Sequence, residues 1–330
     1  MTRAAVVVPG LTLALVLAGL VSLGLGYTAL SAGDIARALI AAPDDPTGII
    51  VREIRLPRIV LAALVGGALG LSGAALQGLL HNPLAEPGLT GISASAALGA
   101  VIALYCGGAA VSPWLVPGAG LVGAALAAVA LLVLVGRGAG PLTLILAGVA
   151  LSNAAIALTS LAMNLSPNPF ALSELVLWLL GSVRDRGFDD VLLCLPFLSA
   201  GALALWGTGG GLDALALGDE TARSLGVALG RLRARVVLGT ALAVGASVAV
   251  AGAIGFVGLV IPHLLRPLVG ARPSRLLLPS ALGGALLLVV ADAVVRMISV
   301  GPELQLGVVT ALIGAPFFLS LILARAREAA

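Results

Sequence analysis

The length of the apolar runs constrains this chain more than any other feature of its sequence. Ten segments are long, continuous and almost free of charge: residues 11–30, 59–80, 92–106, 114–135, 142–163, 191–206, 236–254, 256–269, 276–298 and 304–323. A helix of about 20 apolar residues crosses the hydrocarbon of a bilayer. The pattern therefore predicts an all-α, polytopic membrane helical bundle with about ten transmembrane helices. Because segments 92–106 and 256–269 are short, we expect them to be tilted or packed inside the bundle.

The composition excludes a soluble fold. The chain is 60% hydrophobic and 10% charged, whereas soluble domains carry roughly 25% charged residues. The runs also do not alternate in polarity, as strands of an outer-membrane barrel do. We predict one transmembrane domain over residues 1–330, with a further short helix at 173–180 that is re-entrant or lies at the surface. A signal peptide is the alternative for residues 11–30, although the run is long and no clear cleavage site follows.

The distribution of charge favours one orientation. Ten crossings put both ends of the chain on the same side of the membrane. Placing them in the cytoplasm leaves eleven of the 18 basic residues inside, together with only five of the 15 acidic ones. Because basic residues accumulate in cytoplasmic loops, we expect a multi-pass protein of the inner (plasma) membrane with cytoplasmic termini.

All 18 basic residues are arginine, and this excludes several kinds of chemistry. A Walker A loop needs a lysine for the nucleotide phosphates, so ATP and magnesium would be bound by a partner subunit. Cys106, Cys194, His81 and His263 are too few and too scattered for a convincing zinc site. We therefore expect no bound cofactor, no metal and no catalytic residue in this chain, and we interpret the two histidines as packing groups.

Three blocks of sequence carry a family resemblance. Residues 81–91 read His-Asn-Pro-Leu-Ala-Glu-Pro-Gly-Leu-Thr-Gly and form a polar elbow between two apolar segments. Proline fixes φ and lacks an amide donor, so the helix before it must end and the connection is rigid. With Arg55-Leu56-Pro57-Arg58 and residues 255–263 (Gly-Phe-Val-Gly-Leu-Val-Ile-Pro-His), this elbow resembles the iron-chelate and cobalamin permease family of type II ABC importers. The resemblance runs from about residue 30 to residue 323.

The resemblance implies a function and an assembly. The chain would be the permease subunit of an ATP-driven importer that moves an iron chelate, a ferric siderophore or haem, by alternating access. Cobalamin is the alternative cargo. The expected assembly is a homodimer in the lipid bilayer with two ATP-binding cassette subunits and one periplasmic or lipid-anchored substrate-binding protein, and with no nucleic acid partner.

Residues 212–235 form a polar loop on the expected cytoplasmic side. Within it, Glu220-Thr221-Ala222 followed by Gly226 resembles the coupling motif of ABC permeases, with Thr in place of an Ala. Short helices with an apolar face can dock in a groove of a soluble partner. The resemblance implies ATPase coupling through Asp219, Glu220, Thr221, Ala222, Arg223, Leu225 and Gly226. An ordinary surface loop is the alternative.

Three arginines lie near the expected outer face. Arg55 and Arg58 begin the second span, and Arg296 ends the ninth. The resemblance implies that they dock the binding protein, and guanidinium groups pair well with carboxylates. Snorkelling to the interface is the alternative. Asp292 lies four residues before Arg296, so we expect an ion pair between them in preference to a proton relay.

The fifth span carries a polar stripe. Its members are Ser152, Asn153, Thr159, Ser160 and Asn164, and the tenth span adds Thr310 and Ser320. A polar stripe can line an aqueous pathway, and the Pro-rich residues 165–170 that follow can form a gate. The resemblance implies that the fifth and tenth spans line a translocation pathway at the dimer interface. Interhelical hydrogen bonding is the alternative. Gly66, Gly70 and the other small residues of the second span are predicted to form a close-packing face.

Two rival classes fit the sequence less well. An ion-coupled secondary transporter needs ionisable groups near the membrane midplane, where Asp292 is the only candidate. A membrane enzyme needs clustered His, Cys or acidic residues inside the spans, and the sequence has none. Siderophore, haem and cobalamin carriers share the motifs above, so the sequence does not separate their cargoes.

Overall fold

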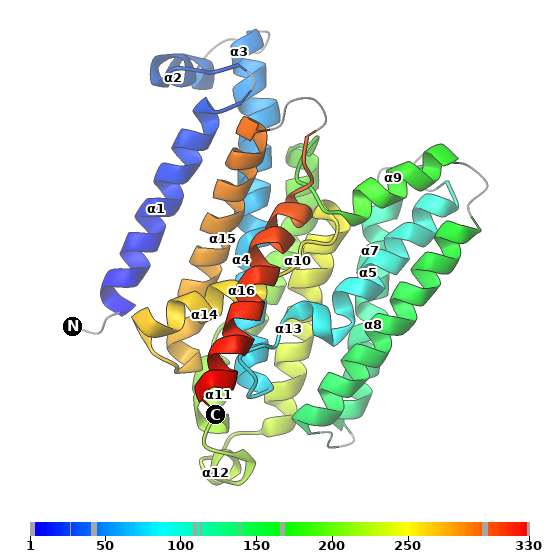
Figure 1. Cartoon of the computed structure of the whole chain (residues 1–330), viewed down its shortest axis with the longest axis vertical. Helices are drawn as coiled ribbons and strands as arrows, with labels where there is room; N and C mark the ends of the chain where they lie inside the picture. Colours follow the sequence, from blue (N-terminus) through cyan, green and yellow to red (C-terminus); the bar gives the residue numbers. More distant parts are fainter. Residues whose placement is uncertain are drawn as a thin grey trace.

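The computed structural model describes residues 4–26, 28–40, 45–107, 111–112, 114–136, 138, 140–165, 169–298 and 303–328, and every regular element in those ranges is helical (Figure 1). Each of the ten apolar segments contains a helix. These are α1 (Ala4–Gly24), α4 (Leu56–Leu79), α5 (Ile92–Tyr105), α7 (Leu115–Gly136), α8 (Pro141–Asn164), α10 (Phe188–Leu205), α13 (Leu229–Ala251), α14 (Val257–Val269), α15 (Pro273–Ile298) and α16 (Leu306–Glu328). The predicted all-α bundle is confirmed.

Not all ten helices have the length of a full span. Among the described residues, seven helical stretches are long and apolar enough to cross a membrane by length and composition. One of them, Pro46–Leu79, joins α3 (Pro46–Ile49), a π-helical segment at Ile50–Arg55 and α4 without a break. Three shorter apolar helices remain, Ile92–Tyr105, Val257–Val269 and Leu306–Leu321. The count of about ten crossings therefore stays a prediction.

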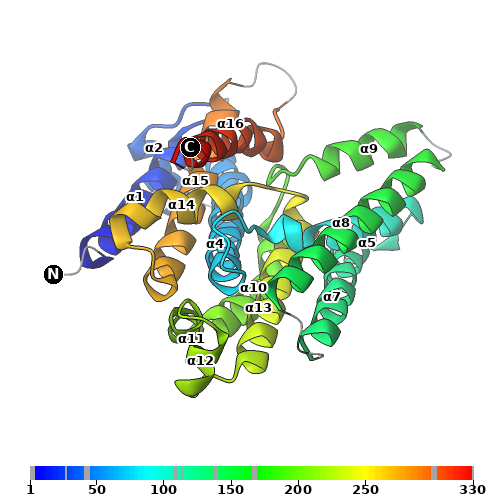
Figure 2. The same ribbon diagram turned by 60° about the horizontal axis from the view of Figure 1, so that its bottom comes forward.

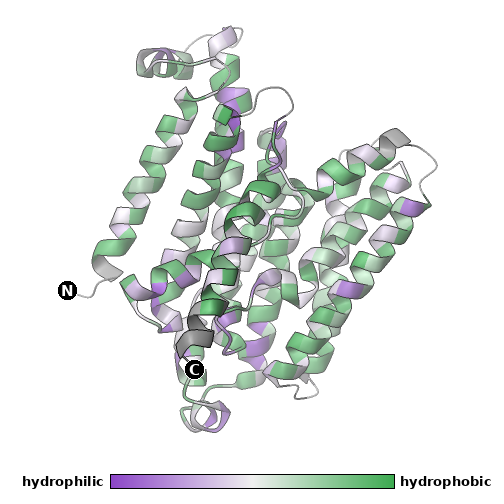
Figure 3. Cartoon of the chain, viewed as in Figure 1, coloured by the Kyte–Doolittle hydropathy of each residue, from purple (hydrophilic) through white to green (hydrophobic). Residues whose placement is uncertain are grey.

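The long helices run side by side, with α5 and α14 among them, and the shortest helices lie at the two ends (Figures 1 and 2). One end carries α2 (Ala32–Ile40), α3 and α9 (Pro169–Leu179), and we call it the α2 end. The other carries α11 (Gly209–Leu215) and α12 (Asp219–Ser224), and we call it the α12 end. Figure 3 shows apolar residues along the long helices, with hydrophilic ones at α12 and where α4 reaches the α2 end.

Helices α4 and α15 cross at backbone contact. An added Cβ at Gly66 would overlap the carbonyl group of Gly284, and one at Gly70 would overlap that of Ser280. Gly73 meets the backbone of Gly258 in α14 in the same way. The predicted close-packing face is confirmed at these positions, and it places α4 in the centre of the bundle.

The elbow between α4 and α5 runs inside the bundle. It leaves α4 through His81, whose φ is 49°, and its middle is a 3₁₀ turn at Pro87–Thr90 that ends on Gly91 with φ 77°. The Thr90 hydroxyl donates to the Pro87 carbonyl oxygen at 2.6 Å. The 3₁₀ turn packs against α8, α5 and α4. These contacts hold residues 86–88 among the helices and away from the surface of the bundle.

Candidate functional site

A cavity of about 400 Å³ opens between the elbow and the helices around it. Its walls come from α4, α5, α8 and α9, from residues 86–88, and from residues 253–256 and Gly258 around the start of α14. Leu69, Ile156 and Met163 contribute apolar surface, and the polar side chains are those of Glu86, Ser93, Ser152, Thr159 and Ser160. A mostly apolar pocket with a few placed polar groups is typical of small-molecule sites.

The predicted pathway residues of α8 divide into two groups. Ser152, Thr159 and Ser160 line the cavity, whereas Asn153 and Asn164 are exposed on α8 and do not. The Ser152 hydroxyl donates to the Gly88 carbonyl oxygen at 3.0 Å, which ties α8 to the elbow. The structure thus brings three of the five together, and their role in transport stays a prediction.

The two pathway residues of α16 lie elsewhere. Thr310 is buried, donates to the Gly307 carbonyl oxygen at 3.0 Å and borders a separate small space beside Phe256. Ser320 is exposed and donates to the Phe317 carbonyl oxygen at 2.6 Å. Residues 166–168, the centre of the predicted gate, lie outside the described residues.

Glu86 is the cavity residue that sequence reasoning did not select. We expected it in a cytoplasmic connection, because the elbow lies between two apolar segments. The sequence does show a single carboxylate between Pro83 and Pro87, which could have marked Glu86 as a candidate. Its place in the cavity, however, depends on α8 and α14, which come later in the chain.

The Glu86 carboxylate is held at the start of α14. The backbone N–H of Phe256 donates to it. Burial raises the pKa of Glu86, and the hydrogen bond from Phe256 offsets part of that rise. Phe256 has φ 67°, a left-handed conformation that is uncommon for a bulky residue, and its ring lies against Gly314 of α16, where a Cβ would overlap it. The carboxylate position therefore depends on a constrained turn.

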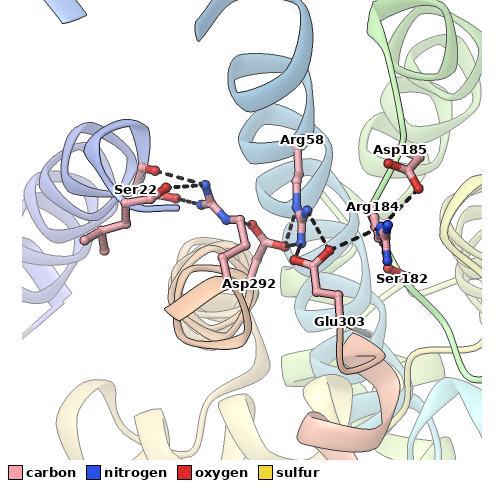
Figure 4. A network of polar contacts seen from close by, with 9 residues as sticks. Ser22, Arg58, Ser182, Arg184, Asp185, Asp292 and Glu303 are labelled. Carbon is pink, nitrogen blue, oxygen red and sulfur yellow. Dashed lines mark hydrogen bonds and ion pairs between the residues drawn. The ribbon is translucent and has the colours of Figure 1, made fainter. Parts of the chain in front are cut away.

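A cluster of buried charges lies at the α2 end (Figure 4). Arg58 donates to Asp292 at 2.8 Å and to the two carboxylate oxygens of Glu303 at 2.7 and 3.3 Å. Arg296 pairs with the second oxygen of Asp292 at 3.1 Å. The predicted ion pair between Asp292 and Arg296 is confirmed, and Arg58 shares the same carboxylate. We call Arg58, Asp292, Arg296 and Glu303 the outer charge cluster.

Arg55 and Arg296 fasten the end of α1. Arg55 donates to the carbonyl oxygens of Leu23 and Thr28, both at 2.6 Å. Arg296 donates to the Leu25 carbonyl oxygen at 2.9 Å and to the Ser22 hydroxyl. The last carbonyl groups of a helix lack partners within it, so the two guanidinium groups satisfy acceptors that lipid could not.

These contacts set a condition on the predicted docking role. Arg55, Arg58 and Arg296 are 5%, 8% and 7% exposed, and each has partners within the chain. A carboxylate of another protein reaches them only if those contacts open. Arg184, which the sequence did not single out, is the more accessible arginine: its side chain is 47% exposed and pairs with Glu303 at 3.4 Å and with Asp185 at 3.1 Å. Docking through the three predicted arginines stays a prediction.

The predicted coupling residues lie at the α12 end, and their apolar side chains differ in exposure. Ala222 is buried, while Leu225 and the neighbouring Leu217 are 62% and 66% exposed. Asp219 is held by Arg233 at 2.7 Å, which anchors α12 to α13. Glu220, Thr221, Arg223 and Gly226 are exposed beside Leu225. This arrangement presents an apolar side chain ringed by polar and charged groups, and its contact with an ATPase is a prediction.

Both histidines make packing contacts. The His81 ring lies with Nε2 2.9 Å from the Leu215 carbonyl oxygen, so the elbow begins in contact with α11. The His263 ring meets Phe317 edge-on with a centroid separation of 5.7 Å. The described part of the chain contains no group of three or more His, Cys, Asp or Glu residues that could hold a metal.

Comparison with known proteins places the chain among transporters. The model of the FecCD transport family matches residues 14–324. An uncharacterised ABC transporter permease of Bacillus subtilis, YvrB, is 43% identical over 289 residues, which cover 86% of this chain and 81% of that protein. The vitamin B12 import system permease protein BtuC of Salmonella typhi is 40% identical over 320 residues, 96% of this chain and 94% of that protein.

A solved structure agrees with these relatives. It is an inward-facing conformation of an ABC transporter provisionally assigned to the metal-chelate type. Its sequence is 33% identical, the TM-score is 0.86, and the match covers 96% of this chain and 98% of that one.

Proposed function

Because this chain belongs to the FecCD transport family, we propose that it is the membrane permease subunit of an ABC importer for metal chelates or cobalamin. The observation that carries the proposal is the family match over residues 14–324, on a bundle with a cavity among its helices. ATP hydrolysis belongs to a separate partner subunit, and the chain itself is a transport protein and not a catalyst.

Within this class the cargo has two candidates. Relatives that carry the name of vitamin B12 import share 40% identity over 96% of the chain, which favours cobalamin. The iron chelate expected from the sequence, a ferric siderophore or haem, is the second candidate, and the metal-chelate description of the solved neighbour supports a chelate in general.

The assembly we propose is a homodimer in the inner membrane, with cytoplasmic termini. Two ATPase subunits would dock on α12 and its flanking loops, where Glu220, Arg223 and Leu225 are exposed. One binding protein would deliver cargo at the α2 end, near Arg184 and the outer charge cluster. Cargo would pass Ser152, Thr159 and Ser160 as ATP binding favours one state of the two halves over the other.

The experiment that tests this function is ATP-dependent uptake into proteoliposomes. The permease is reconstituted with the ATPase and binding protein encoded beside it, and cyanocobalamin, a ferric hydroxamate and haem are offered in turn. We expect uptake of one cargo that requires both partners and stops with an ATPase subunit unable to hydrolyse ATP. Uptake driven by an ion gradient without ATP would overturn the proposal.

A further inference from the structure

Arg184 differs from the three predicted docking arginines in how it is held. Its side chain is 47% exposed, and its Nε lies 3.1 Å from Asp185 and 3.4 Å from Glu303 (Figure 4). In the described part of the chain, no hydrogen bond engages its two terminal nitrogens. Guanidinium groups commonly grip a carboxylate through two parallel hydrogen bonds. Arg184 can therefore accept a further carboxylate without releasing a buried partner.

The backbone around Arg184 is anchored to the bundle. The Arg184 N–H donates to the Ser182 hydroxyl at 3.0 Å, and the Ser182 N–H donates at 2.7 Å to the carbonyl oxygen of Ala251, the last residue of α13. Asp185 follows with φ 55°, a left-handed conformation that tightens the turn before α10. The guanidinium group is thus presented from a fixed turn, which lowers the entropic cost of ordering it against a partner.

A hollow of about 210 Å³ lies beside Arg184 at the surface of the α2 end. The polar side chains of its wall are those of Ser182, Arg184, Asp185, Arg186 and Gln305. Trp178 adds apolar surface. The wall therefore offers two guanidinium groups, a hydroxyl and an amide to a side chain that enters it, which suits a carboxylate.

The acids around the two guanidinium groups are either committed to other donors or weakly held. Glu303 accepts from Arg58 at 2.7 Å, and Asp190, the partner of Arg186, also accepts from the Gly187 N–H at 3.0 Å. The side chain of Asp185 is 83% exposed, so its pairing with Arg184 takes place largely in water. Exposed ion pairs of this kind contribute little and exchange readily.

We propose that Arg184 receives a carboxylate of the substrate-binding protein, while the buried arginines of the α2 end keep their partners within the chain. The buried arginines are Arg55, Arg58 and Arg296. The inference rests on the proposed function and names the contact through which its partner docks. The incoming carboxylate replaces Asp185 on Arg184, and this exchange opens no buried ion pair, which would be far more costly. The buried arginines then act as supports, because Arg58 holds Glu303 beside Arg184.

The test measures the affinity of the binding protein for the complete transporter. The permease and its ATPase subunits are placed in nanodiscs, and the binding protein encoded beside them is immobilised, without added cargo, for surface plasmon resonance at low and high salt. We expect Arg184→Gln to weaken binding on the order of ten-fold and to reduce its salt dependence, as loss of one interfacial charge pair does. Unchanged affinity in this variant would overturn the inference.

The matched control is Arg37→Gln. Arg37 is an exposed arginine at the same end of the bundle and pairs with Asp34 at 2.7 Å, as Arg184 pairs with its own neighbours. We expect it to bind like wild type, and both variants should keep the wild-type melting temperature because the side chains are exposed. Equal weakening by Arg37→Gln and Arg184→Gln would show a general effect of positive charge and would overturn the assignment to Arg184.

Glu303→Gln separates docking on Arg184 from docking on Arg58. It removes a competing carboxylate from both arginines, so we expect tighter binding. If Arg184 receives the partner's carboxylate, this gain disappears in the double variant with Arg184→Gln. A gain that persists in the double variant would assign docking to Arg58 and overturn the inference.

The outcomes keep the inference and the proposed function apart. ATP-driven uptake by a transporter whose binding protein does not respond to Arg184→Gln would remove the docking contact and leave the importer intact. If the wild-type transporter does not bind this protein at all, the proposed function fails first.

The partner's carboxylate can be located with a double-mutant cycle. Each exposed Asp or Glu of the binding protein is changed to Ala and tested against wild-type and Arg184→Gln transporter. For one of them we expect a loss of affinity that does not add to the loss from Arg184→Gln, because both remove the same pair. Full additivity at every acidic position would contradict the inference.

Discussion

At the scale of single residues, Asp292 joins two arginines of the outer charge cluster. It is 1% exposed and shared between Arg58 and Arg296. Replacing it with Asn leaves two buried guanidinium groups with one anionic partner fewer. Breaking a buried ion pair in this way costs about 3–5 kcal/mol. We expect Asp292→Asn to lower the melting temperature of the purified permease in detergent.

The control for Asp292 is Glu53→Gln, which removes an exposed carboxylate from the Pro46–Leu79 helix. This variant should have the same melting temperature as the wild type. If the Asp292→Asn protein also has the melting temperature of the wild type, the outer charge cluster does not stabilise the fold.

Glu86 gives a prediction about pH. Burial raises the pKa of Glu86 above its ordinary value of 4.5, so the folded protein holds this proton more tightly than the unfolded chain does. The resulting stabilisation is complete below pH 4.5 and is lost as pH rises through the raised pKa. Glu86→Gln cannot lose a proton, so its melting temperature should rise relative to wild type across that window. A difference that stays constant from acid to neutral pH would contradict the assignment.

Residue roles that depend on nearby positions could be predicted from the sequence, and those that depend on distant ones could not. The pairing of Asp292 with Arg296 follows from a spacing of four on a helix. The partners of Arg58 lie 234 and 245 residues away, and nothing in the sequence links them. The same holds for Glu86, whose partner Phe256 belongs to another helix.

At the scale of elements, α12 carries the prediction of ATPase coupling. Exchanging the exposed charges with Glu220→Arg and Arg223→Glu should abolish most retention of the ATPase subunit in a pull-down, because the complementary surface is reversed. The protein level and melting temperature should not change. Asp34→Lys with Arg37→Glu reverses an exposed pair on α2, at the opposite end, and serves as control. Equal ATPase retention by both double variants would remove the coupling role.

The crossing of α4 and α15 gives a second element-scale prediction. Gly70→Ala places a methyl group against the Ser280 carbonyl, so the helices must separate. Overpacking of this kind costs roughly 1–3 kcal/mol, and we expect a lower melting temperature and a smaller monodisperse peak in size-exclusion chromatography. Gly118→Ala in α7 meets no atom within 4 Å and should leave both unchanged. If Gly70→Ala leaves the melting temperature and the chromatographic peak unchanged, the two helices can move apart enough to accept the methyl group.

The helices themselves were predictable because apolar run length is a local property. All ten predicted segments contain a helix, and the short helices at 173–180 and in the 212–235 loop also formed. The π-helical segment at Ile50–Arg55 and the inward course of the elbow were not predicted. The elbow packs against α8, which lies far away in the sequence, and propensity does not report such contacts. The π-helical segment packs on its sequence neighbours α1 to α4, and its pattern of residues carries no recognised signal for a π-helix.

At the scale of the whole molecule, the exposed face of α8 is the proposed meeting point of two copies. Asn153 and Asn164 lie on that face and outside the cavity. In a background without Cys106 and Cys194, we expect Asn153→Cys or Asn164→Cys to give an oxidised dimer in native membranes. Leu203→Cys, 69% exposed on α10, should stay monomeric. Cross-linking at Leu203 but at neither asparagine would place the interface elsewhere.

Of the two arginines that fasten the end of α1, Arg55 is made soon after the helix and Arg296 only near the end of the chain. Ser22 and Arg296 are separated by 274 residues, so α1 enters the bilayer before this second partner exists. Its high apolar content is enough for insertion as a lone helix. During that interval only the Arg55 contacts are available to hold the end of α1. Synthesis of α15 supplies the Arg296 contacts, so the first helix of the chain is fully fastened only when one of the last helices has been made.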